Sequence, residues 1–416
     1  PALNLITRIL ILKFYYLCPT MKPADRISRL NESQTIAMAR KSRELIASGV
    51  DIISLSLCEP DFHTPEKIKE AAKKAIDDNF SYYTHVSGYL ELREAISQKF
   101  KRDNGLDYSA DQIVVSTGAK QSIANAVLSL INPGDEVLVP APYWVSYLEI
   151  IKMAEGIPVV IPTGISQDFK VRPADLEKHL SPKTRMCIFS SPCNPTGSVY
   201  SREELQELAG FFAKHKNIFI VSDEIYEHIN FVGKHTSIAS FPEVYDQTIT
   251  VNGVSKAFAM TGWRVGYMGA PAWIAKACDK MQGQFTSATC SIAQKATLTA
   301  VLMDPKEIEP MKTAFFKRKE LCRKLLAEIP GFRVNDPGGA FYFFPEVSAL
   351  FGKSFQGKTI NNGTDLSMYL LEQAHVALVP GAAFGDDNYI RFSYATSEER
   401  LKKAIERMKK AIETLS

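Results

Sequence analysis

Paired cysteines, long apolar runs and an excess of charge of one sign are all missing from this sequence. Its seven cysteines are scattered, with no CxxC pair and no metal-ligand spacing, so we expect neither a disulfide framework nor a metal site. The net charge of +3 is too small to favour nucleic acid or an anionic membrane as a partner. Internal repeats and low-complexity tracts are also missing. These absences predict a protein of a reducing, cytoplasmic compartment.

The N-terminus carries an apolar stretch over residues 3–17, which Arg8 and Lys13 interrupt. It is too short to span a bilayer, and no small-residue cleavage site follows it. Met21 precedes a sequence that resembles an ordinary cytosolic start. We therefore interpret residues 1–20 as an upstream extension, translated or introduced by cloning and without order; a membrane anchor is the alternative.

The length of 416 residues, with 45% hydrophobic and 23% charged residues, is ordinary for a soluble enzyme of two domains. Apolar runs alternate with helical patterns from about residue 113 to 269, which predicts an α/β domain with a mostly parallel sheet covered by helices on both faces. We expect its strands at residues 112–116, 136–140, 156–162, 185–190, 218–222 and 248–251. Beyond residue 282 the pattern predicts a smaller α+β domain.

We predict that residues 62–299 form the large domain and residues 300–416 the small one, which residues 21–61 join. Further expectations are a helix over 26–48, a helix over 65–79 capped by Thr64, and a mobile loop over 352–363.

The stretch from Thr248 to Gly269 carries the strongest chemical signal. It places Lys256 between two apolar runs and Arg264 eight residues later. Burial disfavours a charged lysine and favours its use as an amine nucleophile. Arginine is a permanent bidentate donor suited to a phosphate. An amine beside a phosphate anchor suggests pyridoxal phosphate, held on Lys256 as a Schiff base.

Polar residues follow several other predicted strands, where ligands of parallel sheets bind. Gly118, Ala119 and Lys120 form a turn into a helix N-terminus, which suits an anion; Lys120 could instead neutralise a substrate carboxylate or be solvated. Trp144 could stack on a flat ring or belong to the core. Asp223 ends an apolar strand and would hold a pyridine nitrogen protonated.

Two more side chains point to ligands. Asn194 could donate to a phenolate oxygen or belong to a plain Asn-Pro turn. Arg391 lies in the apolar strand over 389–395, on the face opposite Ile390 and Phe392, and a buried arginine there needs an anion.

The segment Ser255–Gly266 resembles the lysine motif of the class I/II aminotransferases, which have the fold type I architecture, and the resemblance runs from about Arg26 to the C-terminus. It implies a homodimer with active sites at the subunit interface and pyridoxal phosphate on Lys256. It implies cofactor roles for Ser255, Arg264, Gly118, Ala119, Lys120, Trp144, Asn194, Asp223 and Tyr226, and for Tyr83 toward the phosphate of the neighbouring subunit. It implies that Arg391 binds the substrate α-carboxylate.

Within this family the chain is most similar to bacterial aspartate aminotransferases that overlap with prephenate aminotransferases. Thr35 and Lys120 resemble a pair associated with prephenate use, and Asn194 and Trp144 also lie where substrate binds. Cys58 stands where the family usually has glycine, which leaves the local geometry and the substrate range open.

We therefore expect an enzyme of amino acid metabolism that transfers the amino group of aspartate to 2-oxoglutarate in a ping-pong cycle. Alternatives on the same scaffold are a prephenate, aromatic or alanine aminotransferase and a carbon–sulfur lyase. A non-catalytic cofactor-binding module of the kind fused to transcription regulators is a further rival, disfavoured because no DNA-binding pattern precedes Met21.

Overall fold

The structure, a computed structural model, describes residues 22–31 and 34–416, with the side chains of all of these except residues 34–36 and 39. The chain divides into two compact units, residues 1–31 and 32–416. In the first unit the structure describes one short helix, α2 (Asp25–Ser28). The predicted extension over residues 1–20 lies outside the described residues. The second unit carries all the elements discussed below.

A seven-stranded sheet lies at the centre of the second unit, in the strand order β2-β8-β7-β6-β5-β3-β4. Only β8 runs antiparallel to its neighbours among these strands, so the predicted mostly parallel sheet is confirmed. The strands are β2 (Ile113–Ser116), β3 (Glu136–Ala141), β4 (Ile157–Pro162), β5 (Thr184–Ser190), β6 (Phe219–Asp223), β7 (Thr248–Gly253) and β8 (Gly266–Gly269).

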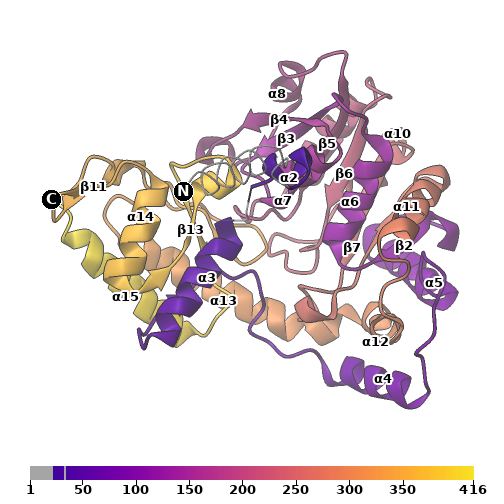
Figure 1. Cartoon of the computed structure of the whole chain (residues 1–416), viewed down its shortest axis with the longest axis horizontal. Helices are drawn as coiled ribbons and strands as arrows, with labels where there is room; N and C mark the ends of the chain where they lie inside the picture. Colours follow the sequence, from indigo (N-terminus) through magenta and orange to yellow (C-terminus); the bar gives the residue numbers. More distant parts are fainter. Residues whose placement is uncertain (1–21, 32–33) are drawn as a thin grey trace, which may run out of the picture. The chain divides into compact units, whose positions relative to one another are not determined.

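Helices cover both faces of this sheet (Figure 1). Because successive strand residues point to opposite faces, Val137 and Val139 pack into one core and Leu138 into another. The first core includes α6 (Ala119–Leu130), α7 (Ser146–Met153) and α11 (Ala272–Phe285); the second includes α8 (Pro173–Glu177), α9 (Arg202–Phe212) and α10 (Pro242–Tyr245). Each fully buried aliphatic side chain contributes about 1.5–3 kcal/mol to the free energy of unfolding.

The edge formed by β2 and β8 is covered by α4 (Glu66–Asp77), α5 (Leu90–Lys99) and α12 (Ser291–Leu302). The end of α5 continues as a π-helix over Phe100–Asn104. The predicted cap of α4 is wrong: Pro65 is the N-cap residue, and the Thr64 hydroxyl donates to the Ala259 carbonyl at 2.7 Å. Thr64 therefore ties the start of α4 to the loop after Lys256.

A second, antiparallel sheet has the order β13-β14-β9. Its strands β9 (Tyr342–Phe343), β13 (Val379–Pro380) and β14 (Ile390–Ser393) share a core with α13 (Glu309–Leu326), α14 (Gly363–Tyr369) and α15 (Glu398–Glu413). Strand β1 (Ile53–Ser54) pairs in parallel with β12 (Val376–Ala377), and α3 (Gln34–Ala47) contacts β12 and β13. Residues near both ends of the unit thus build this α+β region (Figure 1).

Three local expectations differ from the structure. The helix predicted over 26–48 is not continuous: α2 ends at Ser28, residues 29–31 are not helical, and α3 spans Gln34–Ala47. The loop predicted over 352–363 contains a hairpin of β10 (Ser354–Phe355) and β11 (Lys358–Thr359). Helices α7 and α11 were not expected. Residues 32–416 form one compact unit, so the boundaries predicted at residues 61 and 299 stay predictions.

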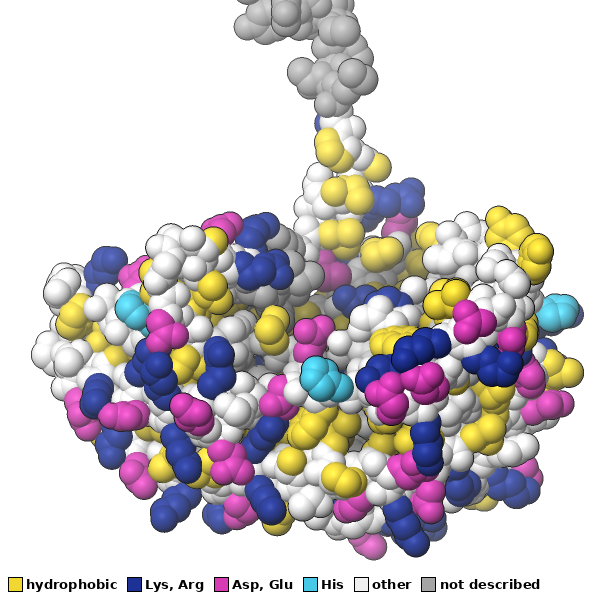
Figure 2. All heavy atoms as spheres, turned by 90° about the horizontal axis from the view of Figure 1, so that it is seen from below, with side chains coloured by type: hydrophobic (Ala, Val, Ile, Leu, Met, Phe, Trp, Pro, Cys, Tyr) yellow, Lys and Arg dark blue, Asp and Glu magenta, His cyan; other side chains and the backbone are white. Residues whose placement is uncertain are grey.

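On the face drawn in Figure 2, Lys and Arg side chains are interspersed with Asp and Glu side chains. This mixture agrees with the small net charge of the whole sequence. Among the residues that the structure describes, no helix has the length and apolar character needed to cross a membrane.

Candidate active site

The carboxyl ends of β2, β3, β5, β6 and β7 meet at one edge of the large sheet, because these strands all run in the same direction. A cavity of about 310 Å³ opens there. Ten residues predicted from the sequence line it: Cys58, Ala119, Lys120, Trp144, Asn194, Asp223, Tyr226, Ser255, Lys256 and Arg264. Residues from six separate stretches of the chain therefore converge on one pocket.

Lys256 lies in the turn that follows β7, between the buried residues Ser255 and Ala257. Its ammonium donates a hydrogen bond to the Cys58 carbonyl and stands 5.7 Å from the centroid of the Tyr226 ring. Burial lowers the pKa of the Lys256 ammonium. A lysine in these surroundings releases its proton more readily than an exposed one, as a nucleophile or a proton acceptor requires.

The turn between β2 and α6 approaches Arg264 closely. Gly118 has φ of 84°, and a Cβ there would lie 2.3 Å from Arg264 Nη2, so this position requires glycine. The Arg264 guanidinium donates to the carbonyls of Thr261 at 3.0 Å and Thr117 at 3.4 Å. No acidic partner of Arg264 appears among the described ion pairs. Because α6 begins at Ala119, this arrangement is chemically suited to an anion.

Asp223 ends β6 and is 5% exposed. Its Oδ2 accepts a hydrogen bond from the Tyr147 hydroxyl at 2.7 Å, and its Oδ1 accepts one from the Ile225 N–H at 3.3 Å. Burial raises the pKa of this carboxyl to about 6, although both donors favour the ionised form. The Tyr226 hydroxyl shares a 2.8 Å hydrogen bond with that of Tyr342. A cationic ring nitrogen beside Asp223 would compensate its buried charge.

Lys120 and Trp144 both line the cavity, and because Lys120 is exposed and Trp144 half-buried, the pair lies at its mouth. The Lys120 ammonium is 5.0 Å from the centroid of the Trp144 ring, and that ring meets Tyr147 edge to face at 5.4 Å. A cation held over an aromatic face remains available to an anion on its other side. Besides solvation, two roles are expected for Lys120: binding the cofactor phosphate and binding a substrate carboxylate. Its position beside Trp144 suits a substrate carboxylate at the mouth.

Arg391 is fully buried on β14. It donates from Nη1 to the Asn194 side-chain oxygen at 3.0 Å and from Nη2 to the Ser56 carbonyl at 2.7 Å, while Nε has no partner. The guanidinium carbon lies 4.7 Å from the centroid of the Tyr342 ring. In the described part of the chain no carboxylate pairs with this cation, and both of its hydrogen-bond acceptors are neutral oxygens.

Three predicted residues that the structure describes, Gly118, Tyr83 and Arg391, are not among those that line the cavity. Gly118 lies against Arg264 and Arg391 contacts Asn194, so both adjoin the lining. Tyr83 is 98% exposed and does not line the cavity of its own chain. The side chain of Thr35, on α3, lies outside the described residues. Tyr147 was missed: it faces the cavity one helical turn after Trp144, and the spacing would have indicated it if helix α7 had been predicted.

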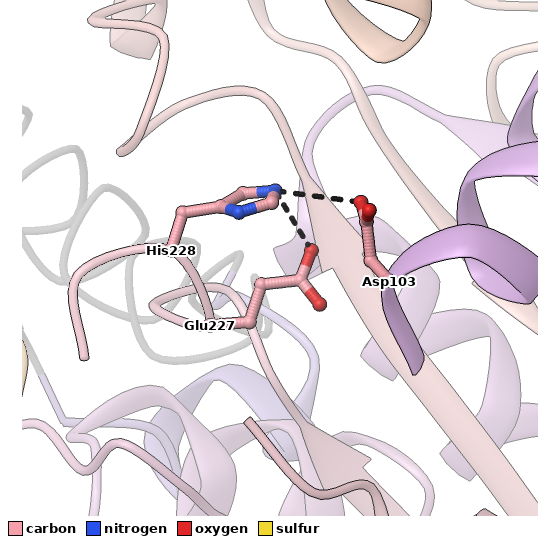
Figure 3. A group of neighbouring side chains, drawn as sticks. All are labelled: Asp103, Glu227 and His228. Atoms are coloured by element: carbon pink, nitrogen blue, oxygen red, sulfur yellow. Dashed lines mark ion pairs between the residues drawn. The ribbon is translucent and has the colours of Figure 1, made fainter. Parts of the chain in front are cut away.

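A second group of charged side chains surrounds the buried Glu227, four residues beyond the end of β6. Figure 3 shows His228 pointing toward Glu227 and Asp103, with Nε2 at 3.2 Å and 3.9 Å from their carboxylate oxygens. The Lys99 ammonium contacts the same Glu227 carboxylate, and Asn104 donates to its other oxygen at 2.7 Å. These residue types suit a metal ion, but the lysine already supplies the cation, so we interpret the group as an ion-pair network.

Known proteins similar to this chain agree on one family. A sequence profile described as aminotransferase class I and II matches residues 50–408. The chain is 48% identical to a Petunia hybrida bifunctional aspartate aminotransferase and glutamate/aspartate-prephenate aminotransferase, over 94% of this chain and 83% of that protein. It is 45% identical to an aspartate/prephenate aminotransferase of Cereibacter sphaeroides, over 92% of this chain and 97% of that protein.

Solved structures give the same result. An aspartate aminotransferase from Rhizobium meliloti superposes with a TM-score of 0.92 at 41% identity, over 95% of this chain and 100% of that chain. An aspartate aminotransferase from Thermus thermophilus with maleate superposes with a TM-score of 0.88 at 38% identity, over 94% of this chain and 100% of that chain. The expected fold type I architecture is thereby confirmed.

Proposed function

The chain belongs to the class I and II aminotransferases, and we propose that it transfers the amino group of aspartate to 2-oxoglutarate with pyridoxal phosphate as cofactor. The observation that carries this proposal is the surplus of cations over carboxylates at one cavity: Lys120, Lys256 and Arg264 line it against Glu59 and Asp223. The buried Arg391 adds a fourth cation through its contact with the lining residue Asn194. A phosphate and two substrate carboxylates are the anions that would match them.

The residues present fit the cofactor. The Gly118 turn, the N-terminus of α6 and Arg264 form an anion cradle that a Cβ at Gly118 would fill. Asp223 suits a protonated pyridine nitrogen and Trp144 a ring face, while Tyr226 and Asn194 suit a phenolate oxygen. When bound, the cofactor supplies an electron sink for the carbon from which a proton is removed.

Lys256 would hold the cofactor covalently and afterwards act as the base. Its lowered pKa allows Nζ to be neutral at the moment when the substrate Cα proton must be taken. Tyr147 donates to Asp223 and so fixes the carboxylate that faces the ring. The Cys58 carbonyl positions the amine by accepting its hydrogen bond.

The substrate class follows from two cations at different depths. Arg391, buried and without a carboxylate partner, would bind the α-carboxylate with a bidentate fork. Lys120, at the mouth, would bind the distal carboxylate of aspartate, glutamate or prephenate. The relatives named aspartate/prephenate aminotransferase support this choice. Alanine, aromatic and carbon–sulfur lyase activities rank behind it, because a neutral side chain would leave Lys120 unmatched.

We also propose a homodimer. Tyr82 and Tyr83 are 83% and 98% exposed, and two neighbouring aromatic side chains in water are costly unless a partner covers them. In the dimer, Tyr83 would reach the cofactor phosphate of the partner subunit. A cytoplasmic location stays a prediction; the six described cysteines, all free thiols, support a reducing compartment.

The half-reaction tests the substrate. Mixing the holoenzyme with single amino acids reports amino transfer as a change in cofactor absorbance, without a second substrate. We expect aspartate and glutamate to react about ten- to a hundredfold more efficiently than alanine or phenylalanine, since an unpaired charged group costs roughly 1.5–3 kcal/mol.

Lys120→Ala should remove this preference, whereas Lys214→Ala, an exposed lysine outside the cavity, should keep it. Cofactor affinity must be measured in parallel, because Lys120 also lies at the phosphate turn. Equal losses on dicarboxylic and neutral donors, with cofactor affinity unchanged, would place a neutral or aromatic donor ahead of aspartate.

A further inference from the structure

The anchor loop, residues 257–264, leads from the proposed catalytic lysine to the arginine of the phosphate site. Its backbone has an unusual conformation: Ala259 and Arg264 have φ values of 51° and 57°, in the left-handed region that residues with a Cβ rarely adopt. A short 3-10 helix, Thr261–Trp263, lies between them. A non-glycine residue keeps such a conformation only where the surrounding structure holds it, so the contacts on this loop determine where the Arg264 guanidinium lies.

The strap, residues 58–64, connects β1 with α4 and contacts the anchor loop through two side chains. The first is Thr64, whose hydroxyl donates to the Ala259 carbonyl at 2.7 Å. Threonine before a helix often caps it, but no side-chain capping bond forms at the start of α4, where Pro65 is the N-cap residue. The Thr64 hydroxyl thus holds the carbonyl of a left-handed residue and not the helix.

The second contact continues to the phosphate site. The Glu59 carboxylate accepts a hydrogen bond from the Thr261 hydroxyl at 3.0 Å. The Thr261 carbonyl in turn accepts from Arg264 Nη1 at 3.0 Å, while Arg264 Nη2 lies against Gly118. A chain of hydrogen bonds therefore runs from the strap to the guanidinium that faces the phosphate turn.

The middle of the strap is fixed to α13. Asp61 accepts two hydrogen bonds from the Arg318 guanidinium, at 2.6 and 2.9 Å. The same guanidinium lies 5.1 Å from the centroid of the Phe62 ring, which meets the Phe315 ring edge to face at 5.3 Å. Because a bidentate arginine–carboxylate pair has a fixed geometry, the strap has a firm support of its own.

We propose that Thr64 and Glu59 are positioning residues for Arg264, which hold the anchor loop in the conformation that directs the guanidinium toward the cofactor phosphate before the cofactor binds. The proposal rests on the function proposed above for the identity of the cofactor, and it adds the residues that preorganise the phosphate site. A preorganised site needs less ordering of the protein on binding. Loss of these contacts therefore weakens affinity for the phosphate group and not for the pyridine ring.

Binding to the full-length apoprotein tests the role of Thr64. Absorbance titration gives the dissociation constants of pyridoxal phosphate and of pyridoxal, which has the same ring without the phosphate. Thr64→Val removes the hydroxyl and keeps the branched shape, whereas Thr64→Ser keeps a donor. Thr248→Val is the matched control, because the Thr248 hydroxyl also donates to a carbonyl at 2.7 Å, that of Val244, at the amino end of β7.

We expect Thr64→Val to weaken the affinity for pyridoxal phosphate by about three- to tenfold, as for the loss of one ordinary hydrogen bond, and to leave the affinity for pyridoxal unchanged. Thr64→Ser should recover most of this loss, and Thr248→Val should bind both compounds as the wild type does. In an Arg264→Ala background, Thr64→Val should add no further loss, because the group that Thr64 positions is gone.

Two substitutions separate the hydrogen bond of Glu59 from its charge. Glu59→Gln keeps an oxygen acceptor for the Thr261 hydroxyl, and Glu59→Leu removes it, while both remove the same negative charge. We expect pyridoxal phosphate to bind about three- to tenfold more weakly to Glu59→Leu than to Glu59→Gln, and pyridoxal to bind equally to both.

Equal losses for pyridoxal phosphate and pyridoxal in Thr64→Val would overturn the proposal, as would wild-type affinities in this variant or an undiminished effect of it in the Arg264→Ala background. Equal binding of pyridoxal phosphate to Glu59→Leu and Glu59→Gln would overturn the role of Glu59. Failure of the proposed function has a different signature. If no amino donor changes the cofactor absorbance while Thr64→Val loses affinity for the phosphate-bearing compound alone, the substrate assignment is wrong and the positioning role stands.

Discussion

Asp223 and Glu227 are buried carboxylates four residues apart, and their pKa values move in opposite directions. Burial raises the pKa of Asp223 to about 6. Burial would also raise the pKa of Glu227, but the charges of Lys99, His228 and His235 outweigh it and lower the pKa to about 2. The desolvation is similar at both sites; the difference is the presence of cations supplied by the chain.

The regions around these two carboxylates differ in the same respect, which is whether the chain compensates their charges. Around Glu227 the chain provides both signs of charge, so the cluster is complete without a ligand. Around Asp223 the cations Lys256, Arg264 and Arg391 form no ion pair with a carboxylate among the described residues. Within that part of the chain Asp223 itself forms no ion pair, and among the groups that change its pKa the charge of Lys256 has the smallest effect. A buried charge that the chain leaves uncompensated indicates a ligand site. A buried charge that the chain itself compensates indicates a structural role.

The largest effect should come from the lysine of the uncompensated region. Lys256→Ala removes the proposed cofactor attachment and the base, so turnover should fall by about 10⁴-fold or more. Because Lys256 donates only to a backbone carbonyl, thermal stability of the apoprotein should stay close to wild type. Steady-state kinetics and calorimetry on the same preparation measure both; retained turnover would refute the assignment of Lys256.

The lysine of the compensated region should show the reverse pattern. Lys99→Met removes the lysine that pairs with the buried Glu227 carboxylate, which costs up to about 3–5 kcal/mol of unfolding free energy, while turnover per folded molecule stays near wild type. Urea unfolding followed by fluorescence measures the loss. Adding Glu227→Gln to Lys99→Met should recover part of it; a variant that is stable but inactive would place the cluster in the catalytic machinery.

Acid should destabilise the protein through Glu227. Its pKa in the folded state, about 2, lies below the ordinary 4.5, so ionisation stabilises the fold above pH 4.5 and this stabilisation is lost as the pH falls toward 2. The 2.5-unit difference corresponds to about 3 kcal/mol in total, of which about 2 kcal/mol is lost between pH 6 and 3. Glu227→Gln should lack this component of the acid dependence; equal slopes for wild type and variant would contradict it.

Asp223 should show the smallest effect, and on cofactor affinity rather than on stability. With a pKa of about 6 in the free protein, its carboxylate is protonated below that pH and ionised above it. Affinity of the apoprotein for pyridoxal phosphate should therefore weaken by up to about tenfold per unit as the pH falls below 6. Fluorescence titration at pH 5, 6 and 7 measures it. Asp223→Asn should remove this component and leave only the titration of the cofactor itself.

Residues that carry chemistry at strand ends could be predicted from the sequence, because alternating apolar patterns fix where parallel strands end. Lys256 and Asp223 follow or end such strands, whereas Arg391 was predicted from its place as the one cation inside an apolar strand. Their partners could not be predicted, since Ser56 and Asn194 meet Arg391 across 335 and 197 residues of chain, and local patterns carry no information on such contacts.

Short helices were the second kind of feature that the sequence did not predict. The sequence of α7, SYLEIIKM, follows an aromatic loop and reads equally well as a strand, so Tyr147 and its bond to Asp223 were not expected. Thr64 is of a residue type that often caps helices, but its hydroxyl donates to the Ala259 carbonyl instead. In both cases a tertiary contact decided between two local structures of similar propensity.

Reduction of the pyridoxal phosphate-loaded enzyme with borohydride, followed by peptide mapping, tests the central claim most directly, because reduction makes the attachment of the cofactor permanent. We predict a single modified peptide, with the added mass on Lys256 and none on Lys99 or Lys120. Modification of another lysine, or of none, would contradict the assignment of the uncompensated region as the active site.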